Sequence, residues 1–301
     1  MQAMATPRLS TRADTPQPRA GWLSFLLQIA LVAGVEVGDD LLRALISPND
    51  PRTAVANAGR IVDFEAAHGL WIEPGLQRYL EQTHQFLGLP IGWDQIVPLV
   101  NGLYSLGQTL FALSFALWVW LRRRPLFAFV RDVFLLTNAL ALALYEAFPV
   151  APPRLTPGLQ FDGRAFVFRD TVFGPGSSGA RLSFNEYSAM PSLHVAWALI
   201  VAATLAWAAR PRLVRLLAPG YPVAMLFTVV VSGNHYLLDG LGAGAVVLVA
   251  GPAAMLIRWR LLRDASPLQT LGRLQRLRRV DQAAPAPAPS VPPLVRPGKA
   301  A

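Results

Sequence analysis

Two histidines and one aspartate have the types and the spacing of a phosphoryl-transfer site. Asp239 follows His235 by four residues, which places imidazole and carboxylate on one face of a helix. Such a carboxylate fixes the imidazole tautomer and makes the other ring nitrogen more nucleophilic. His194 begins another apolar segment and is suited to donate a proton to a departing alkoxide. The three residues therefore predict a histidine that attacks phosphorus, assisted by a second histidine.

The same residues have two other interpretations. A histidine four residues from an aspartate also occurs by chance in helices without a catalytic role. Two histidines and an aspartate would also serve as zinc ligands. However, no further histidine lies nearby to complete the metal shell, and the chain has no cysteine. The lack of cysteine also excludes disulfides, thiolate metal sites and cysteine nucleophiles.

The elements that would position these residues are membrane helices. Of the 301 residues, 53% are hydrophobic and 15% are charged, whereas about 25% are charged in a typical soluble domain. A helix needs about 20 apolar residues to cross the hydrocarbon core. We expect six spans, at about residues 22–46, 96–121, 126–148, 191–209, 219–232 and 236–257.

The segments around these spans predict the domain organisation. A cleaved signal peptide is the competing interpretation of the first span, but no small-x-small cleavage site follows its apolar run. Residues 47–95 predict one or two short amphipathic helices along the membrane interface, with Glu65 and Glu73 on solvated or interfacial faces. We therefore expect a disordered tail at 1–20, a membrane domain at 21–263 and a disordered basic, Pro- and Ala-rich tail at 264–301.

The arginines predict the orientation of the chain. The net charge is +9, from 27 basic and 18 acidic residues. With six spans, 19 basic residues fall on one side and eight on the other. Because basic residues favour the cytoplasmic side, we expect a multi-pass plasma membrane protein with both termini cytoplasmic. His194 and His235 then lie at the extracytoplasmic surface. No soluble face clusters basic and aromatic residues, which argues against nucleic-acid binding.

Three motifs resemble those of the PAP2 (type 2 phosphatidic acid phosphatase) superfamily. AMPSLH at 189–194 resembles its P-S-x-H motif, and NHYLLD at 234–239 resembles its H-x-x-x-D motif. The residues of these two motifs, preceded by FPVAPPRL at 148–155, are similar to those of the Aur1/Ipt1-like inositolphosphotransferase branch. The similarity extends over roughly residues 60–255.

The resemblance implies an all-α polytopic membrane fold, a six-transmembrane-helix bundle of PAP2 type with short interfacial helices. By the family pattern, His235 is the nucleophile that forms a phosphohistidine, and Asp239 orients it. His194 is the general acid for the leaving group and later the base for the acceptor. The resemblance implies no metal and no other cofactor. Arginine forks and backbone amides must then bind the phosphate, with Arg154 as the first candidate.

The chain departs from the superfamily pattern at the phosphate-binding positions. Val229 stands six residues before His235, where the S-R-x5-H element has arginine. No lysine precedes Arg154 to form the K-x6-R-P motif. The rivals of Arg154 are Arg181, Arg164 and Arg131.

Polar residues of the second predicted span bear on which molecule accepts the phosphoryl group. The branch tends to show N-x-x-Y-x-x-x-H, but here Asn101 and Tyr104 are followed by Gln108, so the acceptor is left open. These polar residues either line the lipid site or hold helices together. The residues that we predict to bind phosphate or substrate are Arg154, Ser192, Asn234, Arg181, Tyr104 and Asn101.

Two glycine motifs carry weaker predictions. GPGSSG at 174–179 resembles a phosphate cradle but lacks the lysine and the strand-to-helix setting of a P-loop, so we expect a flap over the site. Gly240 and Gly244 predict close helix packing.

The function that these patterns predict is that of an integral membrane lipid phosphatase or phosphotransferase. It would act at the extracytoplasmic leaflet, on a membrane lipid phosphate, with water or a small alcohol such as inositol as acceptor. Hydrolysis and transfer share their first half-reaction, so the motifs do not separate them. The alternative is a non-catalytic lipid-binding or lipid-transporting membrane protein. The oligomeric state is left open.

Overall fold

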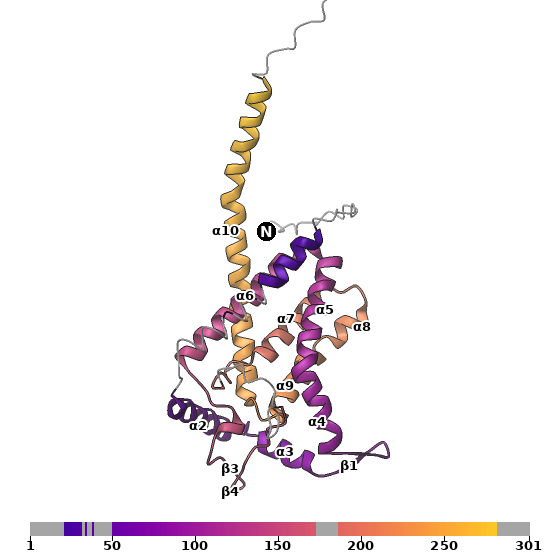
Figure 1. Cartoon of the computed structure of the whole chain (residues 1–301), viewed down its shortest axis with the longest axis vertical. Coiled ribbons are helices and arrows are strands. Elements are labelled where there is room, and N and C mark those ends of the chain that lie inside the picture. The colour runs from indigo at the N-terminus through magenta and orange to yellow at the C-terminus, as the bar shows by residue number, and fades with distance from the viewer. Residues whose placement is uncertain (1–20, 32–33, 35–37, 39–49, 173–185, 282–301) are drawn as a thin grey trace, which may run out of the picture. The chain divides into compact units, whose positions relative to one another are not determined.

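The computed structural model describes residues 21–31, 34, 38, 50–172 and 186–281. Within them the fold is mostly helical, with two short β-hairpins (Figure 1). The tails predicted at 1–20 and 282–301 lie outside the described residues, as does most of the acidic part of the first predicted span.

Three helical stretches are individually long and apolar enough to cross a membrane. The first is α6 (Arg124–Ala147). The second comprises α8 (Arg212–Leu217) and α9 (Gly220–Val231), and the third is the apolar part of α10 (Leu237–Asp281). These helices support a membrane protein.

A fourth candidate span is bent. It consists of α4 (Trp93–Gly102) and α5 (Gln108–Arg122), whose axes differ by 48°. The bend has two physical causes, because Pro98 lies inside α4 and a π-helical turn, η1 (Leu103–Gly107), joins the two helices.

The remaining apolar helices are shorter. The helix at Gly21–Leu31 and α7 (Leu193–Ala208) each have fewer than 18 residues, and the 16 residues of α7 extend about 24 Å. By helix length and composition, the described residues thus provide three candidate spans, or four with the bent pair, rather than the six predicted.

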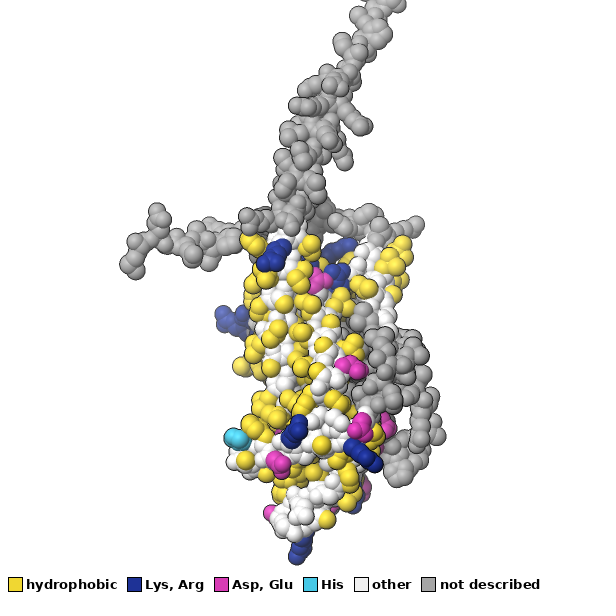
Figure 2. All heavy atoms as spheres, turned by 90° about the vertical axis from the view of Figure 1, so that its left-hand side faces the viewer, with side chains coloured by type: hydrophobic (Ala, Val, Ile, Leu, Met, Phe, Trp, Pro, Cys, Tyr) yellow, Lys and Arg dark blue, Asp and Glu magenta, His cyan; other side chains and the backbone are white. Residues whose placement is uncertain are grey.

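Apolar side chains also cover the outside of these helices. Leu110, Trp207 and Leu248 are 60%, 68% and 76% exposed on α5, α7 and α10. Figure 2 shows that hydrophobic side chains cover most of the middle of one face. Lipid tails are as apolar as these side chains, so their exposure in a membrane carries no cost of the kind that water would impose.

Two short hairpins, which were not predicted from the sequence, accompany the helices. β1 (His84–Phe86) pairs antiparallel with β2 (Leu89–Ile91), and β3 (Gln160–Phe161) pairs with β4 (Arg164–Ala165). Both central residues of each turn have positive φ: 54° and 80° at Leu87 and Gly88, and 51° and 71° at Asp162 and Gly163. This geometry matches the right-handed twist of paired strands, and Asp-Gly is a strong hairpin signal.

Two short helices occupy the region where the sequence predicts one or two. They are α2 (Pro51–Ala67) and α3 (Glu73–Glu81). The Asp50 side chain caps α2 by accepting from Arg52 N, with Pro51 at the first helical position. The buried face of α2, with Ala58 and Ile61, packs in a cluster with residues from the segments that precede α7 and α10.

A second apolar cluster brings the three helices around the site together. Val195 and Ala198 of α7 pack with Met225 and Val229 of α9 and with α10. Gly240 permits the close approach of α9 and α10, because a Cβ there would lie 2.5 Å from Leu226 Cδ1. The predicted close packing at this glycine is present.

The end of the membrane domain also differs from the prediction. α10 continues to Asp281, so the boundary predicted at Arg263 falls inside a helix. Residues 268–280 are rich in leucine, arginine and glutamine, which favour helix. From Met255 on, the described part of α10 belongs to a second unit.

Candidate active site

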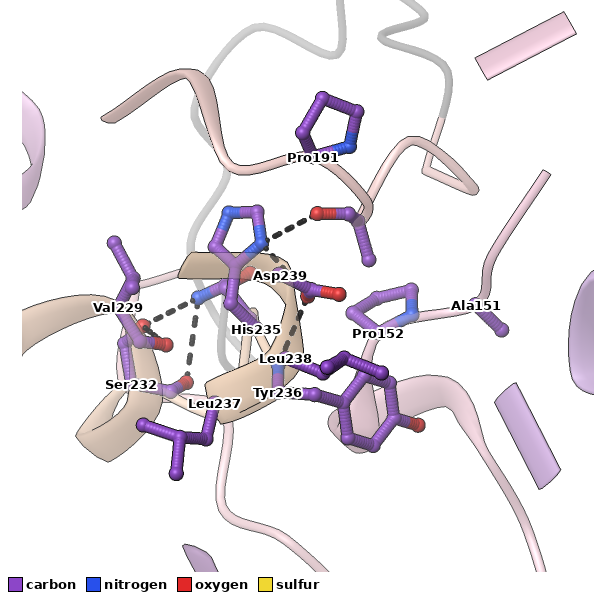
Figure 3. Close-up of polar contacts among 12 residues, drawn as sticks. Ala151, Pro152, Pro191, Val229, Ser232, His235, Tyr236, Leu237, Leu238 and Asp239 are labelled. Carbon is purple, nitrogen blue, oxygen red and sulfur yellow. Dashed lines mark hydrogen bonds and ion pairs between the residues drawn. The ribbon is translucent and has the colours of Figure 1, made fainter. Parts of the chain in front are cut away.

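His235 lies in the turn two residues before α10, and Asp239 lies in the first turn of that helix, so the two residues make the predicted contact without sharing a helix face. His235 Nδ1 lies 3.1 Å from Asp239 Oδ2 and 2.8 Å from the carbonyl oxygen of Ala189 (Figure 3). Because a carbonyl oxygen only accepts hydrogen bonds, Nδ1 carries the proton. In the neutral ring, Nε2 is then the nitrogen with the free lone pair. The pair presents Nε2 as the nucleophilic atom.

The turn before α10 aims His235. His235 N donates to Val229 O over 3.2 Å. Gly233 has a φ of +72°, and a Cβ at this position would lie 2.9 Å from the carbonyl oxygen of Arg169. Only glycine accommodates both the positive φ and the close backbone approach. Gly233 is thus required for the turn that positions His235.

His194 reaches the same place from α7. Its ring centroid lies 6.2 Å from that of His235, and it stacks on the ring of Tyr104 at 4.2 Å. Ser192 precedes α7 and is fully buried. Ser192 N donates to the backbone oxygen of Asp239, whereas its Oγ has no hydrogen-bond partner among the described residues. The fold brings together two histidines that lie 41 positions apart in the sequence.

The segment before α7 is held from several sides. Ala189 N donates to Val150 O over 3.2 Å, and Tyr145 OH of α6 donates to Pro191 O over 2.7 Å. Met190 packs on Gly242 of α10, where a Cβ would lie 3.2 Å from its Cε. These contacts fix the Ala189 carbonyl that orients His235.

Arg154 lies beside the histidine turn, in the short helix η2 (Pro153–Leu155). Its Nε donates to Asn234 Oδ1 over 2.8 Å, and its backbone N donates to Gly233 O over 3.0 Å. One terminal nitrogen lies 3.6 Å from the carboxylate of Asp170, and the side chain is only 10% exposed. The structure therefore places Arg154 and Asn234 together, next to His235.

The polar residues of the second predicted span are partly brought to the site. Tyr104 stacks on His194, and Asn101 Nδ2 donates to Thr171 O over 2.6 Å. The π-helical turn η1 lies between Asn101 and Gln108, so an α-helical spacing does not hold across it. The side chain of Gln108 is not among those described.

A family model described as the PAP2 superfamily matches residues 59–253, more than half of the chain. The chain belongs to the PAP2 superfamily. The superfamily generally comprises phosphatases, which supports an enzyme of the phosphatase type. No curated protein and no solved structure matched the chain. The match is at the level of the superfamily, and the Aur1/Ipt1-like branch stays a prediction.

The three rival arginines of this PAP2 protein are placed differently. Arg164 is exposed on β4. Arg131 hydrogen-bonds Gln28 and Asp132, and it precedes Tyr145 by 14 positions in α6, which corresponds to about 21 Å along the helix. Arg181 and the glycine-rich segment 174–179 lie outside the described residues. Of the arginines that are described, Arg154 is the one beside the histidines.

Two buried glutamates lie behind the site, where surface residues were expected. Glu65 of α2 and Glu73 of α3 are both 0% exposed. Glu65 Oε1 accepts from Leu238 N over 2.7 Å, and Glu73 Oε1 accepts from Leu237 N over 2.6 Å. The interpretation of both glutamates as solvated or interfacial is therefore wrong. A sequence signal existed, because Glu65 continues the buried stripe of Ala54, Ala58 and Ile61 at helical spacing.

The electrostatics of the glutamates follow from their burial. Burial, the charge of Glu73 and the charge of Asp239 raise the pKa of Glu65 to about 9, against the N–H of Leu238, which lowers it. Burial also raises the pKa of Glu73. Burial likewise raises the pKa of Tyr236, whose hydroxyl lies 2.9 Å from Thr156 Oγ1. Glu65 is therefore protonated at neutral pH.

A cavity of about 520 Å³ adjoins the Arg154 ion pair. It is lined by Trp93, Val97, Phe168, Arg169, Asp170 and Thr171. The guanidinium of Arg169 lies 5.2 Å from the centroid of the Trp93 ring. The cavity thus combines an aromatic wall with charged groups of both signs.

The described residues contain no set of side chains that could bind zinc. No three histidine, aspartate or glutamate side chains there are grouped as metal ligands would be.

Proposed function

We propose that this PAP2 protein is an integral membrane enzyme that hydrolyses or transfers the phosphoryl group or phospho-headgroup of a membrane lipid. The reaction proceeds through a phosphohistidine at His235. The observation that carries the proposal is the pair of contacts at His235 Nδ1, to Asp239 and to the Ala189 carbonyl. These contacts commit Nδ1 as a donor and leave Nε2 for attack on phosphorus.

The first half-reaction uses both histidines. Nε2 of His235 forms a bond to phosphorus while the bond from phosphorus to the leaving alkoxide breaks. His194, as an imidazolium that the anionic phosphate favours, gives its proton to the departing oxygen. Asp239 balances the positive charge that His235 acquires on attack.

The second half-reaction reverses these roles. Water or a small alcohol attacks the phosphohistidine, and His194 takes the proton of the attacking oxygen. The bond between phosphorus and Nε2 breaks, and His235 returns to its starting form. Water as acceptor makes the enzyme a phosphatase, whereas an inositol-type alcohol makes it a phosphotransferase. The resemblance to the Aur1/Ipt1-like branch favours the alcohol.

The phosphate is bound by the polar groups around the histidines. Arg154 supplies a guanidinium that Asn234 already orients. Ser192 Oγ, buried at the amino end of α7, is free of described partners and donates to a phosphate oxygen. Arg181 adds a second positive charge, and Asn101 and Tyr104 line the acceptor side.

The membrane arrangement that we propose has six spans. The helix at Gly21–Leu31 and α7 join the three candidate spans and the bent pair. Clusters of arginines before the first helix and after α5, α7 and the apolar part of α10 then face the cytoplasm. His194 and His235 lie at the opposite ends of their helices, at the extracytoplasmic leaflet of the plasma membrane.

Turnover in the presence of a chelator tests this function. The purified protein is given phosphatidic acid, a polyprenyl diphosphate and phosphatidylinositol with excess EDTA, with and without inositol. We expect turnover in the wild type and in His68→Ala, an exposed histidine of the same chain, and none in His235→Ala. A new lipid product that requires inositol identifies a transferase. Binding of these lipids without turnover in the wild type would instead support the non-catalytic alternative.

A further inference from the structure

The start of α10 is held by three carboxyl groups in succession. Tyr236 N donates to Asp239 Oδ2 over 2.9 Å. Leu237 N donates to Glu73 Oε1, and Leu238 N donates to Glu65 Oε1. The first amides of a helix lack partners within the helix and attract negative charge. Two of the three acceptors come from the distant helices α2 and α3.

The two glutamates also act on each other. Their Oε1 atoms accept from the successive amides of Leu238 and Leu237, so the two carboxyl groups are neighbours. The Oε2 atoms of both side chains have no hydrogen-bond partner among the described residues and no access to solvent. Burial, and after it the charge of Glu73, raise the pKa of Glu65. Two buried carboxylates in contact would repel strongly, so a proton between them is what makes the arrangement stable.

We propose that Glu65 and Glu73 form a proton-sharing pair that positions the catalytic turn of this enzyme by holding the amides directly after His235. The pair touches neither the phosphate nor the acceptor, so both glutamates are positioning residues. The inference rests on the proposed function for its effect on turnover. Its structural part, the control of the His235 turn by one buried proton, stands independently.

Loss of the proton on Glu65 adds one negative charge to the pair. The ionisable groups that face it from the packed elements are Asp239 and Tyr236, at the start of α10. The charge on Asp239 raises the pKa of both glutamates, and the amides of Leu237 and Leu238 lower it. Loss of the proton near pH 9 creates an uncompensated buried charge against Asp239.

The test compares Glu65→Gln with Glu65→Leu. The amide of glutamine keeps an acceptor for Leu238 N and a permanent donor for Glu73, whereas leucine removes both. Leucine also leaves the buried Glu73 carboxyl group with Leu237 N as its described hydrogen-bond partner and no neighbouring carboxyl group. Asp63→Asn and Asp63→Leu are matched controls, because Asp63 is an exposed carboxylate in the same helix.

We expect Glu65→Leu to lower kcat about tenfold or more with KM within about twofold, since the nucleophile is misplaced while substrate binding persists. Glu65→Gln should keep most of kcat and lack the fall in rate that the wild type shows as pH rises through about 9. Loss of activity in Glu65→Gln equal to that in Glu65→Leu, or an alkaline limb that Glu65→Gln leaves unchanged, would overturn the inference.

Two measurements without substrate separate this inference from the proposed function. Nitrogen-15 labelling of the four histidines gives a spectrum in which His235 is assigned by its loss in His235→Ala. Glu65→Leu should shift the His235 signals, and Glu65→Gln should leave them in place.

The second measurement is thermal stability as a function of pH. The pKa of Glu65 is raised in the folded state, from 4.5 to about 9, so its contribution to stability is complete below pH 4.5 and is lost as pH rises to about 9.

The melting temperature of the wild type should therefore fall between pH 6 and pH 9 by more than that of Glu65→Gln. Equal falls in the two proteins, or unshifted His235 signals in Glu65→Leu, contradict the inference even if no lipid substrate is found. Conversely, the expected spectra in a protein that turns over none of the lipids would leave the positioning role standing and remove the proposed function.

Discussion

Substitution of Asp239 tests most specifically how the nucleophile His235 is oriented. Asp239→Asn keeps an oxygen that can accept from Tyr236 N but removes the charge that stabilises the imidazolium. We expect kcat to fall roughly 10²- to 10⁴-fold, as for other groups that support acid–base catalysis. Steady-state kinetics on the lipid that the wild type turns over check this, with Asp63→Asn as control. A kcat within threefold of the wild type would contradict the role of Asp239.

Substitutions of Arg154 test whether this residue binds the phosphate. Arg154→Ala should lower kcat/KM about 10- to 100-fold, because a charge-assisted hydrogen bond contributes about 1.5–3 kcal/mol. Arg154→Lys should recover only part of this loss, since an ammonium does not reproduce the guanidinium fork that Asn234 orients. Arg164→Ala, on the exposed hairpin, should retain kcat/KM within twofold. A larger loss of kcat/KM in Arg164→Ala than in Arg154→Ala would indicate that the hairpin binds the phosphate instead.

The residues of the site differ in how far the sequence could reveal them. The four-residue spacing of His235 and Asp239 predicts their contact, but it does not predict that His235 lies in the turn before α10 and that the Ala189 carbonyl also binds its Nδ1. The contact of His194 with the pair required a family motif as well. The partners of Glu73 and Glu65 are amides that lie 164 and 173 positions away, so no local pattern could predict them. Only the helical stripe on α2 indicated that Glu65 is buried.

At the scale of elements, the turn between α9 and α10 controls the site. Gly233→Ala introduces a strained positive φ and a clash with the Arg169 carbonyl, and such strain costs of order 1–3 kcal/mol. We expect a lower melting temperature and a lower kcat. Gly251→Ala is the control, because a Cβ there meets no atom within 4 Å and alanine favours helix. Equal melting temperatures for Gly233→Ala and the wild type would show that the turn is not constrained.

The elements also show where sequence patterns fall short. Apolar runs predict where helices begin and end, and α6, α7 and α9 lie close to the expected ranges. The range expected at 96–121 is divided among α4, η1 and α5. The π-helical turn in the second predicted span has no such signature, so α-helical spacing does not predict how Asn101 and Gln108 are placed relative to each other. The hairpin at Asp162 and Gly163 did have a signal, the Asp-Gly pair, which hydrophobic periodicity does not capture.

At the scale of the whole molecule, the open question is how the chain crosses the membrane. The chain has no cysteine, so single cysteines report accessibility without a background. In intact cells, a membrane-impermeant maleimide should label Arg164→Cys at once and label Arg210→Cys only after permeabilisation. Both positions are exposed, and the proposed orientation places them on opposite sides. The opposite labelling pattern would invert the orientation and place the site in the cytoplasm.

A reporter fused after Ala301 tests the number of spans. Six spans place both termini on one side, so the fusion should be active only as a cytoplasmic reporter. Labelling of a cysteine placed before the first helix should agree with it. Termini on opposite sides would mean an odd number of spans and would exclude the six-span bundle.

The central claim is that His235 carries the phosphoryl group between donor and acceptor. Rapid quenching of the enzyme with a lipid substrate labelled in its phosphate should trap a phosphoenzyme that is stable to base and labile to acid, as a phosphorus–nitrogen bond is. Mass spectrometry of the labelled peptide should place the phosphate on His235, and the label should be absent from His235→Ala. A phosphate on another residue, or turnover that continues in His235→Ala, would contradict the mechanism.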